Sequence, residues 1–224
     1  MSWPLVSGIM PAWNAEEFIG EALESIRAQD YKPFELIVVD DGSDDRTGEI
    51  ARSFAGVRVI RQEHSGRATA CNTAIAAARG VFVTAFDADD LWPPNRISLQ
   101  AEYLLEHPDV GCVLGRQEWI NPPPWLGRDA VYGDLDGIPI GSAMFRRTVL
   151  EQLGGFNATF LHSEDMDLLV RLRERGVRIE ILPEVIWFRR FHGEQMPANA
   201  PAVPPLLRSL REKLERERVQ GLPR

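Results

Sequence analysis

The stretch Val81-Phe-Val-Thr-Ala-Phe-Asp-Ala-Asp-Asp90 joins an apolar run to a group of carboxylates. A short, continuous apolar run bounded by polar residues is typical of a strand that is buried on both faces. Aspartate is depleted in strands, so we expect the strand to end at Phe86. The stretch therefore predicts a buried strand that carries acidic side chains to one edge of a sheet.

Two earlier stretches repeat this pattern of an apolar run followed by polar residues. Leu5–Met10 reaches Pro11-Ala-Trp-Asn14, and Phe34–Val39 runs into Asp40-Asp41-Gly-Ser43. Parallel α/β sheets bind ligands beyond the carboxyl ends of their strands. The three polar clusters, at 11–14, 40–43 and 87–90, therefore predict one shared ligand site.

Helical patterns separate these strands, which predicts an α/β fold with a mostly parallel, Rossmann-like sheet flanked by helices. Asn14 is the expected N-cap of the first helix, with Glu17 completing a capping box, and Phe18, Ile19, Ala22, Leu23 and Ile26 form its apolar face. The other predicted elements of this half are a short helix capped by Asp44 and reaching Phe54, a strand over Val57–Ile60, a helix over Ala68–Ala78 opened by Ser65-Gly66 and closed by Gly80, and a helix from Pro93-Pro94 to about His107.

The second half of the chain is less regular. We expect a surface loop over Asn121–Asp136 because it holds three consecutive prolines and several glycines. The other predicted elements are a strand over Gly141–Phe145 with a short helix through Leu153, a helix over Glu164–Arg175 capped by Ser163, strands over Arg178–Leu182 and Val185–Phe191, a Pro/Ala linker over Ala198–Pro205 and a charged helix over Leu206–Val219.

Composition narrows the functional classes. The 224 residues have a net charge of −8 and are 44% hydrophobic, which suits a folded domain and argues against a generic nucleic-acid binder. No apolar run is long enough to span a bilayer, and the N-terminus lacks the pattern of a signal peptide. The two cysteines, Cys71 and Cys112, have no metal-ligand or disulfide spacing. We expect a cytoplasmic protein.

The acidic clusters suggest specific chemistry. Asp87 and Asp89 project from alternate positions, and two such carboxylates with waters suit Mg²⁺ or Mn²⁺. The alternative is a solvated turn in which Asp90 caps the next helix. Asp40-Asp41 can accept a hydrogen bond from a nucleobase imide, or it can simply form a turn.

Two further clusters lie in the second half. Ser163-Glu164-Asp165 places a carboxylate in a helix first turn, where the helix dipole keeps it ionised and available as a base. Ordinary enrichment of acids in a first turn is the alternative. Arg189 and Arg190 offer donors to a phosphate, and the His192 imidazole can complete a metal shell.

The ordered set of motifs resembles the family 2 glycosyltransferases with a GT-A fold. The matching stretches are Pro11-Ala-Trp-Asn14, Val38-Val-Asp-Asp-Gly-Ser-Asp-Asp-Arg-Thr47, Gly66-Arg-Ala-Thr-Ala-Cys-Asn72, Phe86-Asp-Ala-Asp-Asp-Leu-Trp92, Gly154-Gly-Phe156 and Ser163-Glu-Asp165. The resemblance implies one domain over 1–197, with a nucleotide-binding half at 1–110 and an acceptor-binding half at 111–197. Residues 198–224 would form a linker and a charged helix.

The resemblance also implies roles for individual residues. Asp165 would be the general base of an inverting, single-displacement transfer of one sugar from a nucleoside diphosphate sugar, most simply a UDP-sugar, to an unknown hydroxyl acceptor. Asp89, Asp87 and His192 would hold Mn²⁺ or Mg²⁺, and Asp87 would contact ribose or a metal-bound water. The residues implied to bind the nucleotide-sugar are Pro11, Asn14, Asp40, Asp41, Arg67, Asn72 and Asp87.

Some positions depart from the family pattern. Many relatives carry Arg immediately before Asn72, where this chain has Cys71, and Arg67 is the expected substitute. The Q-x-x-R-W signature of processive synthases is absent, which favours single-sugar transfer. The alternative function is a catalytically inactive nucleotide-sugar-binding or scaffold protein of the same fold. Trp92, Trp125 and Trp187 are candidate sugar-stacking faces, although most of the six tryptophans are expected in the core.

The charged C-terminal helix suggests a contact surface. Its leucines at helical spacing, Leu206 to Leu214, form a stripe surrounded by arginines and glutamates. Docking on the body of the protein, a homodimer contact or a peripheral membrane contact would each use such a stripe.

Overall fold

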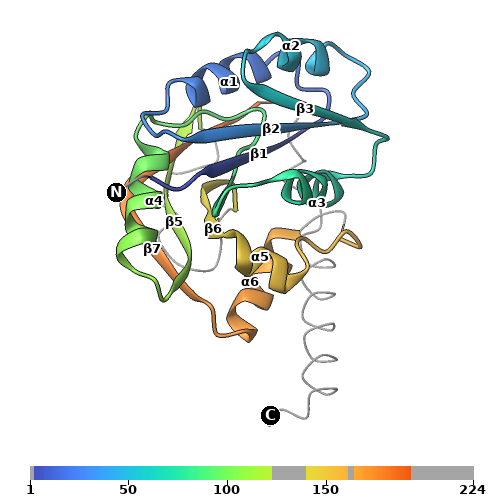
Figure 1. Ribbon diagram of the computed structural model, residues 1–224. Coiled ribbons are helices and arrows are strands. Elements are labelled where there is room, and N and C mark those ends of the chain that lie inside the picture. The colour runs from blue at the N-terminus through green and yellow to red at the C-terminus, as the bar shows by residue number, and fades with distance from the viewer. Residues whose placement is uncertain (1–2, 123–139, 161–163, 193–224) are drawn as a thin grey trace.

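Seven strands form one mixed sheet in the order β3-β2-β1-β4-β6-β5-β7 in the computed structural model of the chain (Figure 1). The structure describes residues 3–122, 140–160 and 164–192. The strands are β1 (Val6–Ala12), β2 (Phe34–Asp41), β3 (Val57–Gln62), β4 (Phe82–Ala85), β5 (Val110–Ile120), β6 (Met144–Arg146) and β7 (Arg178–Arg190).

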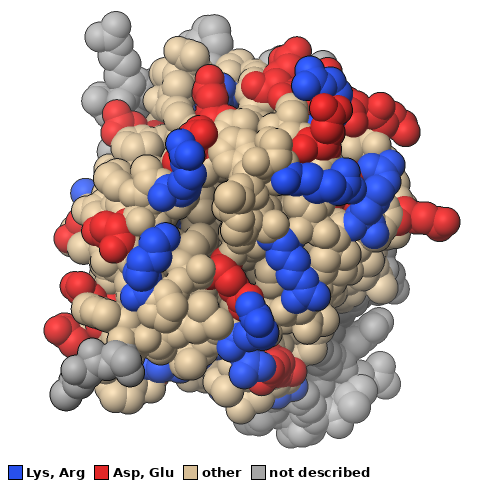
Figure 2. Space-filling model, turned by 45° about the horizontal axis from the view of Figure 1, so that its top comes forward, with Lys and Arg blue, Asp and Glu red and all other residues tan. Residues whose placement is uncertain are grey.

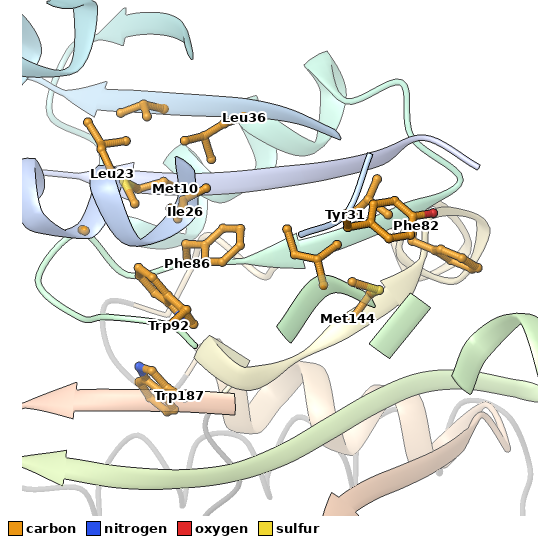
Figure 3. Packing of buried hydrophobic residues seen from close by; sticks show 14 of the residues in the cluster. Met10, Leu23, Ile26, Tyr31, Leu36, Phe82, Phe86, Trp92, Met144 and Trp187 are labelled. Carbon is orange, nitrogen blue, oxygen red and sulfur yellow. The ribbon is translucent and has the colours of Figure 1, made fainter. Parts of the chain in front are cut away.

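Helices cover both faces of this sheet, as the alternation of helix and strand predicts. One face packs against α1 (Ile19–Arg27), α2 (Thr47–Ser53) and α4 (Arg96–Glu106). The other packs against α3 (Arg67–Ala77), α5 (Arg147–Leu153) and α6 (Glu164–Glu174). Figure 3 shows Met10, Leu23, Phe86, Trp92 and Trp187 in the first of these two cores.

The three predicted polar clusters meet at one edge of the sheet. β1 runs parallel to both β2 and β4, with Ala12 opposite Asp40 and Ile9 opposite Ala85. β6 is antiparallel to β4 and β5, and Met144 pairs with Thr84. The short 3₁₀ helix η2 (Ile140–Ser142) therefore precedes β6 at the carboxyl end of β4.

Strands β5 and β7 differ from the sequence predictions. No strand was predicted over Val110–Ile120, and β7 is one strand where two were expected. Both halves of β5 pair with β7. The first half also pairs with β6 and is buried, whereas the second half contains exposed and half-buried residues. Pro183 is tolerated within β7 because it lies on the last strand of the described sheet, near a break in register.

The predicted helix caps at Asn14 and Asp44 are wrong. Helix α1 begins at Ile19 without a side-chain cap, and Asn14 instead has φ +46°. The Asn14 Oδ1 atom accepts a hydrogen bond from the Asp44 backbone N–H over 2.9 Å, which ties the ends of β1 and β2 together. Asp45, not Asp44, accepts the backbone N–H of Thr47 at the start of α2.

Gly80 has a packing role instead of the predicted helix-ending role. Helix α3 is capped by Ala78 in an extended conformation, and the Gly80 N–H donates to Ser7 Oγ over 2.8 Å. A Cβ atom at position 80 would lie 2.6 Å from the backbone N of Ser7. The position therefore requires glycine because two backbone segments approach closely.

Arg96 is fully buried beneath the acidic edge and joins β4 to η2. Its Nη2 atom donates to Thr84 Oγ1 over 3.0 Å and to the carbonyl oxygens of Ala85 and Gly141 over 2.9 Å each. The guanidinium also lies over the Phe86 ring, 4.7 Å from its centroid. Burial lowers the pKa of Arg96 to about 9, against the opposing effect of the nearby aspartates.

Replacing Arg96 with Met should destabilise the fold. The variant leaves the carbonyls of Ala85 and Gly141 without this donor in a buried site, so we expect the free energy of unfolding to fall by about 3 kcal/mol. Urea denaturation measures the change. The matched control Arg52→Met, at an exposed position of α2, should cost less than about 1 kcal/mol. Equal losses in the two variants would contradict the bridging role of Arg96.

Candidate functional site

The turn after β4 places its three aspartates in different surroundings. Asp87 and Asp89 are partly accessible, with side-chain exposures of 20% and 32%, whereas Asp90 is buried. Asp87 bonds to α3, Asp89 contacts the residue that follows β7 by two positions, and Asp90 bonds to β7 itself. The turn is therefore the centre of the candidate site.

Asp89 meets His192, as the family resemblance implies. The Asp89 Oδ2 atom lies 3.0 Å from His192 Nε2, although the two residues are 103 positions apart. His192 follows β7 and stacks on Phe18, with ring centroids 4.4 Å apart. Its Nδ1 atom is buried and has no hydrogen-bond partner among the residues that the structure describes. Over the described ranges, no group of three or more His, Cys, Asp or Glu residues is arranged to hold a metal ion.

Asp87 and Glu164 share the guanidinium of Arg67. The Nη2 atom of Arg67 donates to Asp87 Oδ1 over 2.7 Å, and Nη1 donates to Glu164 Oε1 over 3.1 Å. Burial alone would lower the pKa of Arg67, but the charges of Asp87 and Glu164 hold this pKa well above its usual value. The contact with Glu164 was not predicted, although the residue lies inside the Ser163-Glu-Asp165 motif.

Asp90 ties the end of β7 to this turn and does not cap α4. Its two carboxylate oxygens accept the Trp187 indole N–H and the Arg190 backbone N–H, each over 2.7 Å. Burial, followed by the charges of Asp89 and Asp87, raises the pKa of Asp90 to about 8. Sequence reasoning missed this anchoring role, because its partners are 97 and 100 residues away.

Asp40 and Asp41 are adjacent strand residues and therefore point to opposite faces of the sheet. Asp40 is fully buried and accepts hydrogen bonds from Arg61 Nη1 over 2.6 Å and from the Ser43 backbone N–H over 3.0 Å. Its carboxylate lies against α2, where a Cβ at Gly48 would come within 2.3 Å of Oδ2.

Asp41 organises the entry into α3. Its carboxylate accepts the Gln62 side-chain N–H over 2.6 Å and the backbone N–H groups of Ser65 and Gly66 over 3.0 and 2.8 Å. Pro11 lies in β1 beside this strand, opposite Val39. The structure thus brings Pro11, Asn14 and Asp41 to one edge of the sheet, and their contact with a nucleotide stays a prediction.

Trp13 and His64 are a pair that sequence reasoning did not single out. The Trp13 side chain is 53% exposed and stacks on the His64 imidazole, with ring centroids 4.5 Å apart. His64 Nδ1 also lies 3.1 Å from the Asp41 backbone oxygen. The signal in the sequence was an aromatic residue, Trp13, inside the Pro11–Asn14 cluster at a predicted strand end.

Asn72 and Cys71 make contacts that hold the fold together. Both amide atoms of Asn72 bond to the backbone of Phe156, each over 2.8 Å. Cys71 is fully buried, and burial raises the pKa of its thiol to about 12. A neutral, inaccessible thiol does not act as a nucleophile.

Asp165 is half-buried in the first turn of α6, as predicted. Its Oδ1 atom accepts the backbone N–H of Met166 over 2.8 Å. Within the described residues, its carboxylate makes no hydrogen bond to another predicted site residue, so its role as a base stays a prediction. Ser163, Trp125, most of the Asn121–Asp136 loop, the 198–205 linker and the 206–219 helix lie outside the described residues.

The prediction that Trp92 and Trp187 are sugar-stacking faces is wrong. Their exposures are 3% and 2%, and both belong to the core that also contains Phe86. Arg189 stacks over the rings of Trp119 and Trp187, and Arg190 Nη2 donates to Glu21 Oε2 over 2.6 Å. On the described surface that faces the viewer in Figure 2, acidic and basic side chains are interspersed and form no continuous basic field.

A helix-covered, mostly parallel sheet with acidic turns at its carboxyl edge defines the GT-A class of α/β proteins. The sequence profile described as Glycosyl transferase family 2 matches residues 7–154, and the chain belongs to this family.

Relatives and solved structures agree with this membership. The chain is 33% identical over 172 residues to the UDP-Glc:alpha-D-GlcNAc-diphosphoundecaprenol beta-1,3-glucosyltransferase WfgD of Escherichia coli, covering 72% of this chain and 66% of that protein. It is 39% identical over 217 residues to an uncharacterized glycosyltransferase of Rickettsia typhi, covering 88% and 67%. The mannosyltransferase PcManGT of Pyrobaculum calidifontis, solved with GDP-Man and Mn²⁺, has a TM-score of 0.72 at 26% identity, covering 87% and 59%.

The fold is also that of TarS from S. aureus. Its structure with UDP-GlcNAc has a TM-score of 0.75 at 23% identity, covering 87% of this chain and 61% of that one. The chain spans only part of several relatives, including 20% of an uncharacterized protein of Sinorhizobium fredii and 26% of EpsJ of Bacillus subtilis. Among the helices that the structure describes, none has the length and apolar character needed to cross a membrane.

Gly141→Ala should disturb the turn after β4. A Cβ at position 141 would lie 2.6 Å from Asp87 Oδ2 and 2.9 Å from a ring carbon of Trp187, so we expect a loss of about 1–3 kcal/mol in the free energy of unfolding. Gly20→Ala is the control, because a Cβ there meets nothing within 4 Å and alanine favours α1. Thermal denaturation of both variants measures the difference. A melting temperature for Gly141→Ala at or above that of the wild type would contradict the close packing.

Proposed function

We propose that the chain transfers one sugar from a nucleoside diphosphate sugar to a hydroxyl group of an acceptor, with inversion at the anomeric carbon. The observation that carries this proposal is the meeting of Asp89 and His192 beside Asp87 at the carboxyl edge of a GT-A sheet. Membership of glycosyl transferase family 2 supports the same reaction class.

Asp89 and His192 suit a divalent ion such as Mn²⁺ or Mg²⁺. Magnesium-type ions keep several waters and share substrate phosphates, so two protein ligands from separate strand ends are enough. The His192 Nε2 atom already points toward Asp89 Oδ2, and Asp87 lies two residues away in the same turn. When bound, the ion would offset the charge that builds on the departing diphosphate. The Mn²⁺ in the structure of PcManGT supports this choice of cofactor.

The donor is proposed to be a UDP-sugar. The E. coli relative is named for UDP-Glc, and TarS was solved with UDP-GlcNAc, whereas PcManGT was solved with GDP-Man. A carboxylate accepts about four hydrogen bonds. The Asp41 carboxylate already has four partners, three N–H donors and His64 Nδ1 at 3.1 Å from Oδ2, so it would shape the wall of the nucleotide pocket by holding the start of α3 in place. Pro11 and Asn14 would shape the same pocket, and Asp40 would act from the opposite face by holding Arg61 and Ser43.

Asp165 is proposed to take the proton of the acceptor hydroxyl. The acceptor oxygen forms a bond to the anomeric carbon while the bond from this carbon to the diphosphate oxygen breaks. The proton passes to the Asp165 carboxylate, which lies in the first turn of α6. A single displacement of this kind inverts the configuration.

The organisation of the whole chain follows from this proposal. Residues 1–110 would bind the donor, and residues 111–197 would bind an acceptor whose identity is unknown. The reaction would take place in the cytoplasm, where the predicted C-terminal helix would make a homodimer or membrane contact.

Two substitutions separate donor binding from chemistry. With Mn²⁺ and a panel of UDP-glucose, UDP-GlcNAc and GDP-mannose, Asp89→Ala should weaken binding of the preferred donor by about 10-fold or more. Asp165→Asn should keep donor binding and lower turnover by about 100-fold or more. Calorimetry measures binding, and release of the nucleoside diphosphate measures turnover.

Asp109→Ala is the matched control, because Asp109 is an exposed aspartate paired with Arg178 just before β5, at the edge of the sheet opposite to the site. It should change neither binding nor turnover, and EDTA should reduce wild-type activity. Donor binding without turnover in the wild type would support the inactive sugar-nucleotide-binding protein. Wild-type turnover in both Asp89→Ala and Asp165→Asn would contradict the assigned roles.

A further inference from the structure

The Arg67 side chain connects the donor-side turn to the first turn of α6. It bonds to Asp87 over 2.7 Å and to Glu164 over 3.1 Å, so one guanidinium spans groups from both halves of the chain. The three side chains are 32%, 20% and 9% exposed. Charge-assisted hydrogen bonds in such partly buried surroundings are stronger than exposed ion pairs.

The location of Arg67 is unfavourable for a cation in isolation. Arg67 is the first residue of α3, and the positive end of a helix dipole repels a positive charge. Asp41 fixes this helix start by accepting the N–H groups of Ser65 and Gly66. The attraction of the Asp87 and Glu164 carboxylates outweighs this repulsion. The positive charge of Arg67 is therefore stable at this helix start because it lies between two anions.

The neighbouring position on α3 supplies no second charge. Cys71 lies one turn further along the same helix face and is a buried, neutral thiol. Among the described residues, Arg67 is the only one that bonds to both Asp87 and Glu164. Without Arg67, the carboxylates of Asp87 and Glu164 would lose the cation that links them.

The contacts of α6 divide between its two ends. Arg171, in the last turns, donates to the carbonyl oxygens of Leu153 and Gly155 over 2.9 Å each. The first turn is held by Glu164 against Arg67, and Asp165 is the next residue. The Arg67 bridge therefore governs the end of α6 that carries the proposed base.

We propose that Arg67 is a positioning residue for the transfer step. By holding Glu164 to Asp87, it sets where Asp165 stands relative to the donor turn. This inference rests on the proposed function and assigns Arg67 more than the donor contact expected from its sequence position. Its effect would be on the turnover number, whereas a residue that only binds the donor would affect KM.

The test compares Arg67→Gln, Glu164→Gln, the double variant and Arg67→Lys in the full chain. With UDP-glucose and Mn²⁺, each single Gln variant should lower kcat by about 10-fold or more and change KM by less than about 3-fold. The double variant should lose no more than the worse single variant, because both remove one bridge. Arg67→Lys should recover part of kcat. Arg58→Gln, which removes an exposed arginine from β3, is the control.

Hydrogen exchange of the α6 amides gives a readout that does not depend on activity. Exchange over residues 164–168 should be faster in Arg67→Gln and Glu164→Gln than in the wild type or Arg58→Gln, with no change in α4. Unchanged exchange, additive losses in the double variant, or a raised KM at constant kcat would overturn the positioning role. If the wild type turns over no nucleotide sugar, the proposed function fails, and the exchange measurement still decides whether Arg67 holds α6.

Discussion

Repulsion between carboxylates at one sheet edge is the constraint on which the rest of the site depends. Asp87, Asp89 and Asp90 follow a single strand, and Glu164 approaches them from α6. The four carboxylates have three sets of partners: Arg67 for both Asp87 and Glu164, His192 for Asp89, and two N–H groups for Asp90. Because those partners come from α3 and from the end of β7, neutralising the acids also fixes how the halves of the chain fit together.

The reversed strand β6 makes this arrangement possible. It enters the sheet between β4 and β5 in the opposite direction, which brings η2 against the acidic turn. Arg96 then reaches the Gly141 carbonyl from below, and Gly141 leaves room for Asp87 and Trp187. The second half of the chain is therefore held at the acidic turn after β4 as well as through the hydrophobic core.

Sequence patterns predicted the first half of the fold and its acidic edge because local signals decide both. Continuous apolar runs before Pro11, Asp40 and Asp87 are enough to place three parallel strands. The errors arise where tertiary contacts override local preference. Asn14 and Asp44 have good capping chemistry but bond to each other across two loops, and β5 mixes charged and apolar residues because only part of it is buried. The bridging role of Arg67 and the anchoring role of Asp90 depend on partners 97 or more residues away, which no local pattern reveals.

The proline inside β7 bears on how the protein behaves at high concentration. A long terminal strand offers unpaired backbone groups to any other strand that approaches, which is a route to aggregation. Pro183 removes one donor from that strand, and the surrounding charges of Arg178, Glu180 and Glu184 oppose stacking of one molecule on another. Leu91 also bridges this strand at Phe188, so the segment that leads to His192 is partly covered within the described sheet.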